Sequence, residues 1–400
     1  MRGKVMLKEK TIVLAVSGSI AAYKIPNLAR MLKKEGADVQ VLMTRNAAQF
    51  ITPVTFESLT GNKCLIDTFD RNFKYSVEHV ALAKRADVVM IAPASANVIG
   101  KIACGIADDM LTTTVMACPC KKIVAPAMNH NMYHNPIVQD NLSRLSSFGY
   151  EILSPECGML ANGDEGDGRM PDEAVLFQHI LKETAFEKDL SGKKILVTAG
   201  ATRESIDPVR FITNHSSGKM GRAIARAAAF RGAEVTFIFG HMDAEPPMFV
   251  KKIPVLSAAD MFEEVSKRAE DQDIIIKAAA VADYTPAQTA RGKIKKAEGD
   301  MAIPLKRTTD ILKWLGEHRR PNQIICGFSM ETENLLDNSK KKLISKNCDM
   351  ICANSLSSEG SGFGSDTNVI TLITESGMES LEKMSKDEAA HIILDRLIKL

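Results

Sequence analysis

Two short stretches rich in serine and glycine have the composition of anion-binding turns. The first, SGS at residues 17–19, directly follows the apolar run KTIVLAV at residues 10–16. The second, NHSSGKMG, occupies residues 214–221. Small residues let backbone N–H groups approach a phosphate, and the start of a helix favours its negative charge. Because Met220 follows Lys219 where a P-loop has Ser or Thr, the second turn lacks the usual magnesium ligand of a P-loop.

Both turns lie at the same point of a repeated pattern of strand, turn, helix, glycine stop and strand. The elements are expected at residues 10–16, 21–35 and 38–43 in the first half, and at 193–198, 221–231 and 234–239 in the second. This pattern is the opening of a parallel βαβ unit. We therefore predict an α/β protein with two doubly wound Rossmann-like domains, residues 1–190 and 191–400, divided in the polar stretch 183–192. Further strands are expected at residues 88–92, 122–125, 273–277, 323–327, 350–353 and 368–373, and a last helix at 387–400.

Ligands of open α/β sheets bind where the strands end, so the residues after each strand are candidates for a site. In the first half, Thr44, Ser95 and Asn97 follow expected strands and offer hydroxyl and amide groups. The second strand ends in Thr-Arg-Asn, without the acidic residue that holds an NAD ribose. The first half therefore favours a mononucleotide over a dinucleotide.

Composition and charge exclude several classes of protein. The chain has 400 residues, a net charge of +2 and scattered basic residues, which argues against nucleic-acid binding. No apolar run is long enough for a membrane helix, and the N-terminal segment continues into a helix and strand unlike a signal peptide. The eight cysteines form no C-x-x-C pair, which favours reduced thiols in a cytoplasmic protein.

His130 and His134 have a spacing that suits one turn of a helix and a zinc site. The glutamate of an H-E-x-x-H motif is missing, and the neighbouring Asn131 and Asn135 favour a loop. We therefore expect no metal there, and the sequence leaves any metal ligands of the chain unknown.

The first half resembles the flavin-dependent cysteine decarboxylases. The resemblance is carried by GSIAAYK, His79, APASAN, PAMNHNMY and GDEGDGRMP. It implies an FMN-binding domain that forms trimers, with active sites between subunits. It also implies that His79 is the active-site base or a positioning group, and that Asn129 binds the substrate carboxylate. The flavin contacts implied by the family are Ser17, Gly18, Ser19, Thr44, Ser95 and Asn97.

One position departs from the family pattern. Before the GDxGxGRM motif the family carries a Cys that donates a proton in the final reduction, and Asn162 stands at that place. An amide is not a useful acid. Cys157, another group or water is then left to act as the donor.

The second half resembles the phosphopantothenate–cysteine ligases. The resemblance is carried by NHSSGKMG, by AAAVADY at 278–284 and by KIKK at 293–296. It implies a dimeric domain that uses CTP with Mg²⁺ to activate a carboxylate as an acyl-cytidylate, which the cysteine amine then attacks. Asn214 would hold this intermediate, and Lys293 would neutralise phosphate charge. The CTP contacts implied by the family are Ala279, Asp283, Lys293, Asp310, Phe328, Lys342 and Lys346.

The order of the two halves resembles the bifunctional proteins of coenzyme A biosynthesis. The resemblance implies ligation of cysteine to 4′-phosphopantothenate, followed by decarboxylation to 4′-phosphopantetheine. It also implies a homo-oligomer in which trimers of the first domain and dimers of the second together form a dodecamer. A dinucleotide oxidoreductase is disfavoured because neither half combines G-x-G-x-x-G with an acidic strand end. A flavin-binding regulatory protein with inactive sites is the second alternative; His79, Asn129, Asn214 and Lys293 argue against it, and Asn162 favours it in the first half.

Overall fold

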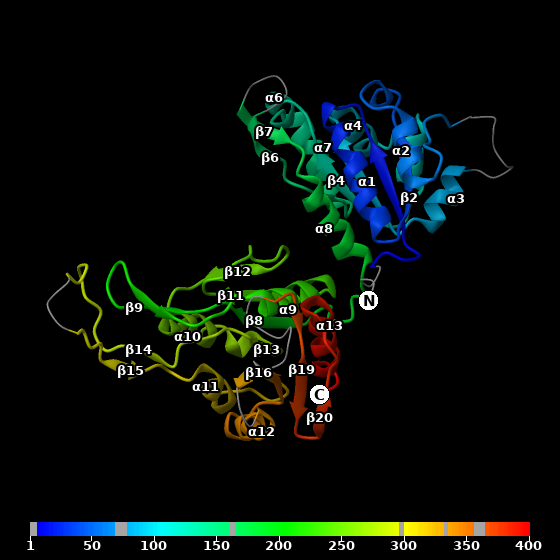
Figure 1. Cartoon of the computed structure of the whole chain (residues 1–400). Coiled ribbons are helices and arrows are strands. Elements are labelled where there is room, and N and C mark those ends of the chain that lie inside the picture. Colours follow the sequence, from blue (N-terminus) through cyan, green and yellow to red (C-terminus); the bar gives the residue numbers. More distant parts are fainter. Residues whose placement is uncertain (1–5, 69–77, 160–164, 296–299, 332–334, 356–364) are drawn as a thin grey trace. The chain divides into compact units, whose positions relative to one another are not determined.

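The chain folds into two compact units, Met1–Phe186 and Glu187–Leu400, in a computed structural model (Figure 1). The structure describes residues 6–68, 78–159, 165–295, 300–331, 335–355 and 365–400. The division falls inside the polar stretch 183–192. Each unit contains its own sheet, wholly parallel in unit 1 and mostly parallel in unit 2, and its own apolar core.

Unit 1 is built on a five-stranded parallel sheet with the order β2-β1-β3-β4-β5. The strands are β1 (Thr11–Val16), β2 (Asp38–Met43), β3 (Val88–Ala94), β4 (Lys121–Pro126) and β5 (Glu151–Ile152). All residues of β1 and β3 are buried, as expected for strands covered on both faces. Because the chain moves from β1 to β2 on one side and to β3 on the other, the topological switch point lies between β1 and β3, where such sheets bind ligands.

The helices of unit 1 cover both faces of its sheet. One core cluster joins strands β1 and β3 to α3, α4, α5 and α7, while α1 packs against α8. The helices are η1 (Ile20–Lys24, a 3-10 helix), α1 (Ile25–Lys34), η2 (Ala47–Gln49), α2 (Pro53–Thr60), α3 (Glu78–Arg85), α4 (Ala96–Ala103), α5 (Met110–Ala117), α6 (His130–Tyr133), α7 (Pro136–Ser147) and α8 (Glu173–Thr184). The hairpin of β6 (Glu156–Met159) and β7 (Glu165–Arg169) lies outside the sheet and contacts α6.

Unit 2 has an eight-stranded sheet with the order β12-β11-β8-β13-β16-β17-β19-β20. The first six strands are parallel and follow the Rossmann order, with the switch point between β8 and β13. Its strands are β8 (Lys194–Ala199), β11 (Glu234–Phe239), β12 (Lys251–Pro254), β13 (Ile274–Lys277), β16 (Ile324–Glu331), β17 (Met350–Ser355), β19 (Ile370–Thr374) and β20 (Gly377–Ser380). The last two pair antiparallel, which the sequence pattern does not distinguish from parallel pairing.

Five α-helices and a 3-10 helix accompany this sheet in the described part of unit 2. They are α9 (Lys219–Phe230), α10 (Ala258–Ser266), η3 (Ala269–Asp271), α11 (Ile311–Glu317), α12 (Leu335–Ser345) and α13 (Lys386–Leu397). The first helix begins at Lys219, two residues before its expected start, because Gly218 adopts the left-handed conformation of its N-cap (φ 70°). Met242 lies where a Cβ at Gly218 would point, so only glycine fits this turn.

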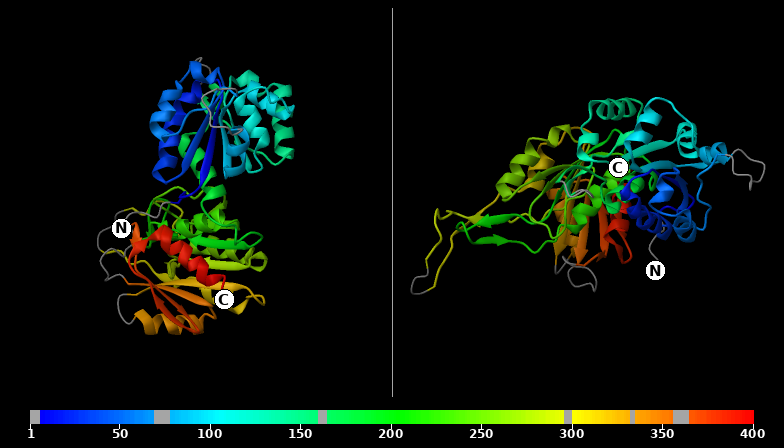
Figure 2. Two further views of the ribbon diagram at one scale, coloured as in Figure 1. Left: turned by 90° about the vertical axis from the view of Figure 1, so that its right-hand side faces the viewer. Right: turned by 90° about the horizontal axis from the view of Figure 1, so that it is seen from above.

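Two hairpins project together from the strand ends of unit 2. They are β9 (Arg203–Ser205) with β10 (Phe211–Thr213), and β14 (Tyr284–Pro286) with β15 (Leu305–Arg307). Figure 2 shows them, in green and yellow, extending side by side. A further short pair, β18 (Thr367–Asn368) and β21 (Met384–Ser385), precedes α13. Among the described residues, no helix combines the length and apolar character of a membrane span.

Candidate functional site

A cavity of about 990 Å³ opens at the switch point of the unit 1 sheet. Its walls include residues that follow β1, β2 and β3, among them the predicted flavin contacts Gly18, Thr44, Ser95 and Asn97, and the rest of its lining includes Asp67, Lys101 and Asp108. Ser95 is the N-cap of α4, and its side chain makes no capping hydrogen bond. The first N–H groups of α4 therefore face the cavity with the positive end of the helix dipole, which suits a phosphate.

The turn after β1 is held in place by Ser17 and Gly18. The buried Ser17 hydroxyl donates to the Pro93 carbonyl (2.6 Å) and accepts from the Ser95 N–H (2.8 Å), so it ties the end of β1 to the end of β3. A Cβ at Gly18 would lie 2.6 Å from the Cβ of Asn46, so this glycine permits the turn to pass close to the residues after β2. The Ser17 side chain thus shapes the turn, a role that its position in the sequence does not reveal.

A second cavity of unit 1, about 580 Å³ in volume, lies between the turn after β1 and the β6–β7 hairpin. Ser19 and Asn129 both line it. The side-chain amide oxygen of Asn129 (Oδ1) accepts from the Asn131 N–H at the start of α6 (2.9 Å), which leaves the side-chain NH₂ as a donor for a carboxylate. Arg169 lines the same cavity and adds a positive charge that the sequence reasoning did not single out, although the motif GDEGDGRMP contains it.

The remaining predicted residues of unit 1 are distributed differently. His79 is the second residue of α3 and half-buried, and it is absent from the lining of both cavities just described. Asn162 lies outside the described residues. Cys157 is exposed on β6, opposite Asp167 of β7, and its thiol hydrogen-bonds the carboxylate of that residue.

In unit 2, predicted nucleotide contacts gather where β13 and β16 end. Asp310, the N-cap of α11, accepts the Lys313 N–H and forms an ion pair with Lys346, the residue after α12 (2.5 Å). Lys342, one turn earlier on α12, donates to the carbonyl of Phe328 on β16 (3.5 Å). The fold thus brings two lysine ammonium groups close to a carboxylate that is distant in the sequence. Asp310 and Lys346, for example, are 36 residues apart.

Two further predicted nucleotide contacts, Ala279 and Asp283, lie in the segment that follows β13. The Ala279 N–H donates to the Thr198 hydroxyl at the end of β8 (3.2 Å), which joins the two strands of the switch point. Asp283 is exposed, and its carbonyl accepts the Thr308 N–H after β15 (3.0 Å). Both residues therefore lie where a Rossmann sheet binds its ligand.

Lys277 ends β13 at this switch point and was missed by the sequence reasoning. Desolvation, followed by the like charge of Lys342, lowers the pKa of Lys277 to about 8. Its ammonium makes no hydrogen bond or ion pair with another described residue, although Asp310 and Asp283 exert a weaker opposing effect on its pKa. A cation without a partner among the described residues, beside a predicted triphosphate site, is a candidate to bind the phosphates. The sequence feature that could have identified it is a lysine at the end of the apolar run DIIIK.

Asn214 and Lys293 are both exposed and belong to the two projecting hairpins. Their supporting loops are joined by Asp207, whose carboxylate accepts the N–H groups of Val209 and Arg210 (2.8 Å each) and of Ile294 (3.1 Å). Desolvation would raise the pKa of Asp207, but these backbone N–H groups and the Arg210 guanidinium together outweigh it and lower the pKa to about 2. Asp207 therefore holds the residue next to Lys293 against the loop that precedes Asn214.

The fold and these sites define a two-unit α/β protein, with a flavoprotein unit followed by a second Rossmann-like unit. Residues 2–185 match the family model "Flavoprotein", and residues 190–400 match "DNA/pantothenate metabolism flavoprotein C-terminal domain". The chain belongs to the family of the coenzyme A biosynthesis bifunctional protein CoaBC. The predicted fold class and family are thereby confirmed.

Relatives extend over nearly the whole chain. The CoaBC protein of Bacillus subtilis is 45% identical over 99% of this chain and 98% of its own length. That of Escherichia coli is 41% identical over 98% of this chain and 97% of its own length. A crystal structure of the C-terminal domain of a CoaBC protein is 44% identical and covers 52% of this chain and 94% of its own, with a TM-score of 0.45.

Proposed function

We propose that the chain makes 4′-phosphopantetheine in two reactions. Unit 2 joins cysteine to 4′-phosphopantothenate and converts CTP to CMP and pyrophosphate, and unit 1 then removes the cysteine carboxylate as CO₂ with FMN as cofactor. The observation that carries the proposal is the pair of sites at the two switch points, one in each unit. The cytoplasm is the proposed location.

The residues of unit 1 fit FMN. The cavity of about 990 Å³ is at the upper end of the volumes typical of cofactor sites, roughly 300–1,000 Å³. The N-terminus of α4 and the Gly18 turn would hold the phosphate, and Thr44, Ser95 and Asn97 would contact the rest of the cofactor. When bound, FMN supplies the reversible electron acceptance that decarboxylation of a cysteine requires.

The second cavity of unit 1 fits the acid end of the substrate. The NH₂ group of Asn129 would bind the carboxylate that is lost. The guanidinium of Arg169, in the same cavity wall, would attract the negative charge of the substrate. We propose that His79 reaches such a site from a neighbouring subunit of a trimer. Exposed apolar side chains at the rim of this cavity support a covering partner, namely Ile20 (53% exposed), Tyr23 (65%) and Met159 (77%).

In unit 2 the proposed nucleotide is CTP with Mg²⁺, and the ion would be held largely by phosphate oxygens and water. The carboxylate of phosphopantothenate attacks the α-phosphorus and releases pyrophosphate, while Lys293 neutralises the developing charge. The cysteine amine then attacks the acyl carbon and releases CMP, with the Asn214 amide orienting the intermediate. Dimeric unit 2 and trimeric unit 1 would together give a dodecamer.

The direct test incubates the full chain with phosphopantothenate, cysteine, CTP and Mg²⁺, followed by mass analysis. We expect a yellow protein, CMP, and a product that lacks CO₂ relative to phosphopantothenoylcysteine. If Asn162 impairs the final reduction, the product is the unreduced enethiol, which has two hydrogens fewer than 4′-phosphopantetheine. A colourless protein that forms no CMP would overturn the proposal.

Lys277 gives the nucleotide site a pH dependence that can be measured separately. With a pKa of about 8, its ammonium loses its charge as the pH rises through that value, and an anionic ligand then binds more weakly. We expect CTP to bind about tenfold more weakly near pH 9 than near pH 7, because one pK unit of coupling corresponds to a factor of ten. Calorimetric titration measures this ratio.

The matched variants are Lys277→Met and Lys340→Met, since Lys340 is an exposed lysine of α12 outside the site. Lys277→Met should bind CTP weakly and equally at both pH values, whereas Lys340→Met should keep the wild-type profile. A wild-type profile in Lys277→Met would show that another group titrates.

A further inference from the structure

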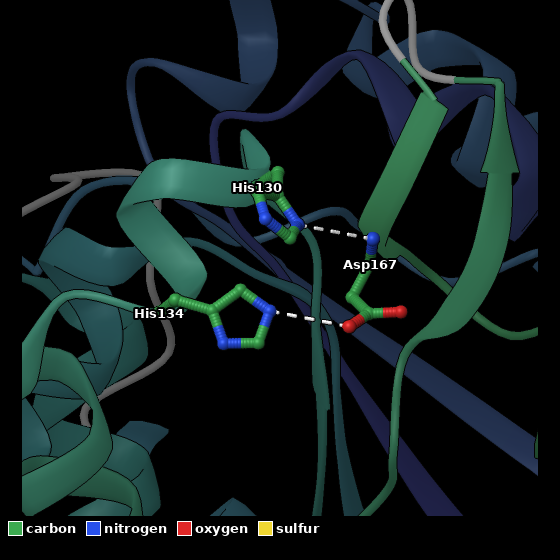
Figure 3. Close-up of side chains that lie close together, drawn as sticks. All are labelled: His130, His134 and Asp167. Atoms are coloured by element: carbon green, nitrogen blue, oxygen red, sulfur yellow. Dashed lines mark hydrogen bonds and ion pairs between the residues drawn. The ribbon is translucent and has the colours of Figure 1, made fainter.

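A cluster of metal-ligating side chains joins α6 to the β6–β7 hairpin (Figure 3). His130 and His134 lie one helical turn apart, and both rings face Asp167 of β7. The Asp167 carboxylate is 3.1 Å from the His134 Nε2, and the Asp167 N–H donates to the His130 Nδ1 (3.2 Å). One ligand atom from each of the three residues lies within 4.8 Å of the others.

The local backbone creates this arrangement. The expectation of a loop here was wrong, because Asn131 lies inside α6 and Asn135 is the N-cap of α7, with its side chain accepting the Ile137 N–H (3.0 Å). A helical turn puts His130 and His134 on one face. The hairpin packs directly against this face, since a Cβ at Gly166 would lie 2.8 Å from the His130 Nδ1.

Cys157 lies beside this cluster, outside the three residues whose ligand atoms are within 4.8 Å of one another. It is the register partner of Asp167 across the hairpin. Hydrogen bonds from the Cys157 thiol, and then from His134, lower the pKa of Asp167. The side chains of His134 and Asp167 are 48% and 41% exposed, so an ion can reach them from solvent.

We propose that His130, His134, Asp167 and Cys157 form a site for a divalent transition metal of the zinc class. Two imidazole nitrogens, a carboxylate oxygen and a thiolate sulfur are the donors that Zn²⁺ takes in closed four-coordinate sites. Two neutral rings with two anionic ligands balance the charge of the ion. Bonds of about 2.0–2.3 Å separate tetrahedral ligand atoms by roughly 3.3–3.7 Å, so small side-chain rotations bring the His130, His134 and Asp167 ligand atoms into place. Cys157 would complete the site by turning toward them from its position opposite Asp167.

Metal binding has a defined structural consequence. The lone pair of the His130 Nδ1 points toward Asp167, since this nitrogen accepts the Asp167 N–H. When a metal binds, a bond from the His130 Nδ1 to the metal replaces this hydrogen bond. The ion then cross-links α6, which begins directly after Asn129, to β7, which carries Arg169. Both residues line the second cavity of unit 1, so the metal fixes the geometry of that cavity wall. The site is structural and does not depend on the proposed reactions.

The test uses the full chain, stripped with a chelator and titrated with Co²⁺ and then Zn²⁺. We expect one equivalent of Co²⁺ to give the visible absorption of a tetrahedral complex, at wavelengths longer than the flavin band, with a thiolate-to-cobalt band in the near ultraviolet. Zn²⁺ should displace Co²⁺ and bleach both features. The Cys157→Ser variant should keep a weakened cobalt complex and lose the thiolate band.

Matched histidine variants decide whether this cluster is the site. His134→Gln and Asp167→Asn should each weaken Zn²⁺ binding by at least about 100-fold, since even loss of an outer-shell partner of a metal ligand can cost that much. His318→Ala, which removes an exposed histidine of unit 2 that stacks on Trp314, should bind as the wild type does. Unchanged affinity in His134→Gln, with circular dichroism showing native folding, would overturn the proposal. Absence of a tetrahedral cobalt spectrum in the wild type would also overturn it.

Discussion

Replacing Lys293 with Gln should reduce CTP-dependent pyrophosphate release by about 10²–10³-fold, the loss typical of removing one electrostatic contact to a transition state. The exposed Lys293 ammonium is the cation that we place on the phosphate attacked by the carboxylate. Glutamine keeps most of the side-chain length and removes the charge. A coupled assay for pyrophosphate measures this first step without the later chemistry.

Two further variants separate charge from position. Asp207→Asn keeps the charge of Lys293 but weakens the clamp that holds the adjacent Ile294 N–H, so it should lower pyrophosphate release less than Lys293→Gln. Lys306→Gln removes an exposed lysine of the same projecting hairpin and serves as the control. Lys293→Gln with pyrophosphate release equal to that of Lys306→Gln would remove Lys293 from the activation step.

Unit 1 provides an internal control for these variants. Flavin content and decarboxylation of supplied phosphopantothenoylcysteine should stay at wild-type levels, because the two units have separate cores. A parallel loss of both activities would indicate a general folding defect.

The sequence predicted the sheets well because their signals are local. The strands at 38–43 and 234–239 have the predicted bounds, since a left-handed glycine, Gly36 or Gly232, ends the helix just before each strand. Strand order was not predicted in either unit, because parallel pairing joins residues far apart in the chain. The strand order is what locates the switch points. These explain why Gly18 lines the cavity of unit 1 and why Lys277 lies at the candidate nucleotide site of unit 2.

Residues that act through long-range contacts were missed for the same reason. Asp207 looks like an ordinary turn residue until the Ile294 N–H, 87 residues away, is found on its carboxylate. Asp167 and His134 are 33 residues apart, and neither neighbourhood contains a metal motif. Amino-acid type and spacing therefore identified candidate chemical groups, while the side chains that position them depended on the tertiary fold.

Replacing Gly168 with Ala should reduce decarboxylation by about 100-fold, because a misplacement of about 1 Å near a reaction centre can cost that much. Gly168 has a φ of +136°, which disfavours an L-residue, and its Cβ would lie at 2.3 Å, in steric conflict with the Met128 carbonyl oxygen. Its carbonyl also accepts the Met128 N–H (3.1 Å). Alanine must therefore push β7, with Arg169, away from the residues that lead into Asn129.

The matched control is Gly61→Ala. Gly61 also has a positive φ (+73°), but its Cβ would meet no atom within 4 Å, so the variant carries backbone strain without the steric conflict. Decarboxylation of supplied phosphopantothenoylcysteine should stay near the wild-type rate in Gly61→Ala and fall in Gly168→Ala, with flavin retained in both because Gly168 does not line the cavity that fits FMN. Equal rates in the two variants would show that the β6–β7 hairpin does not position the substrate.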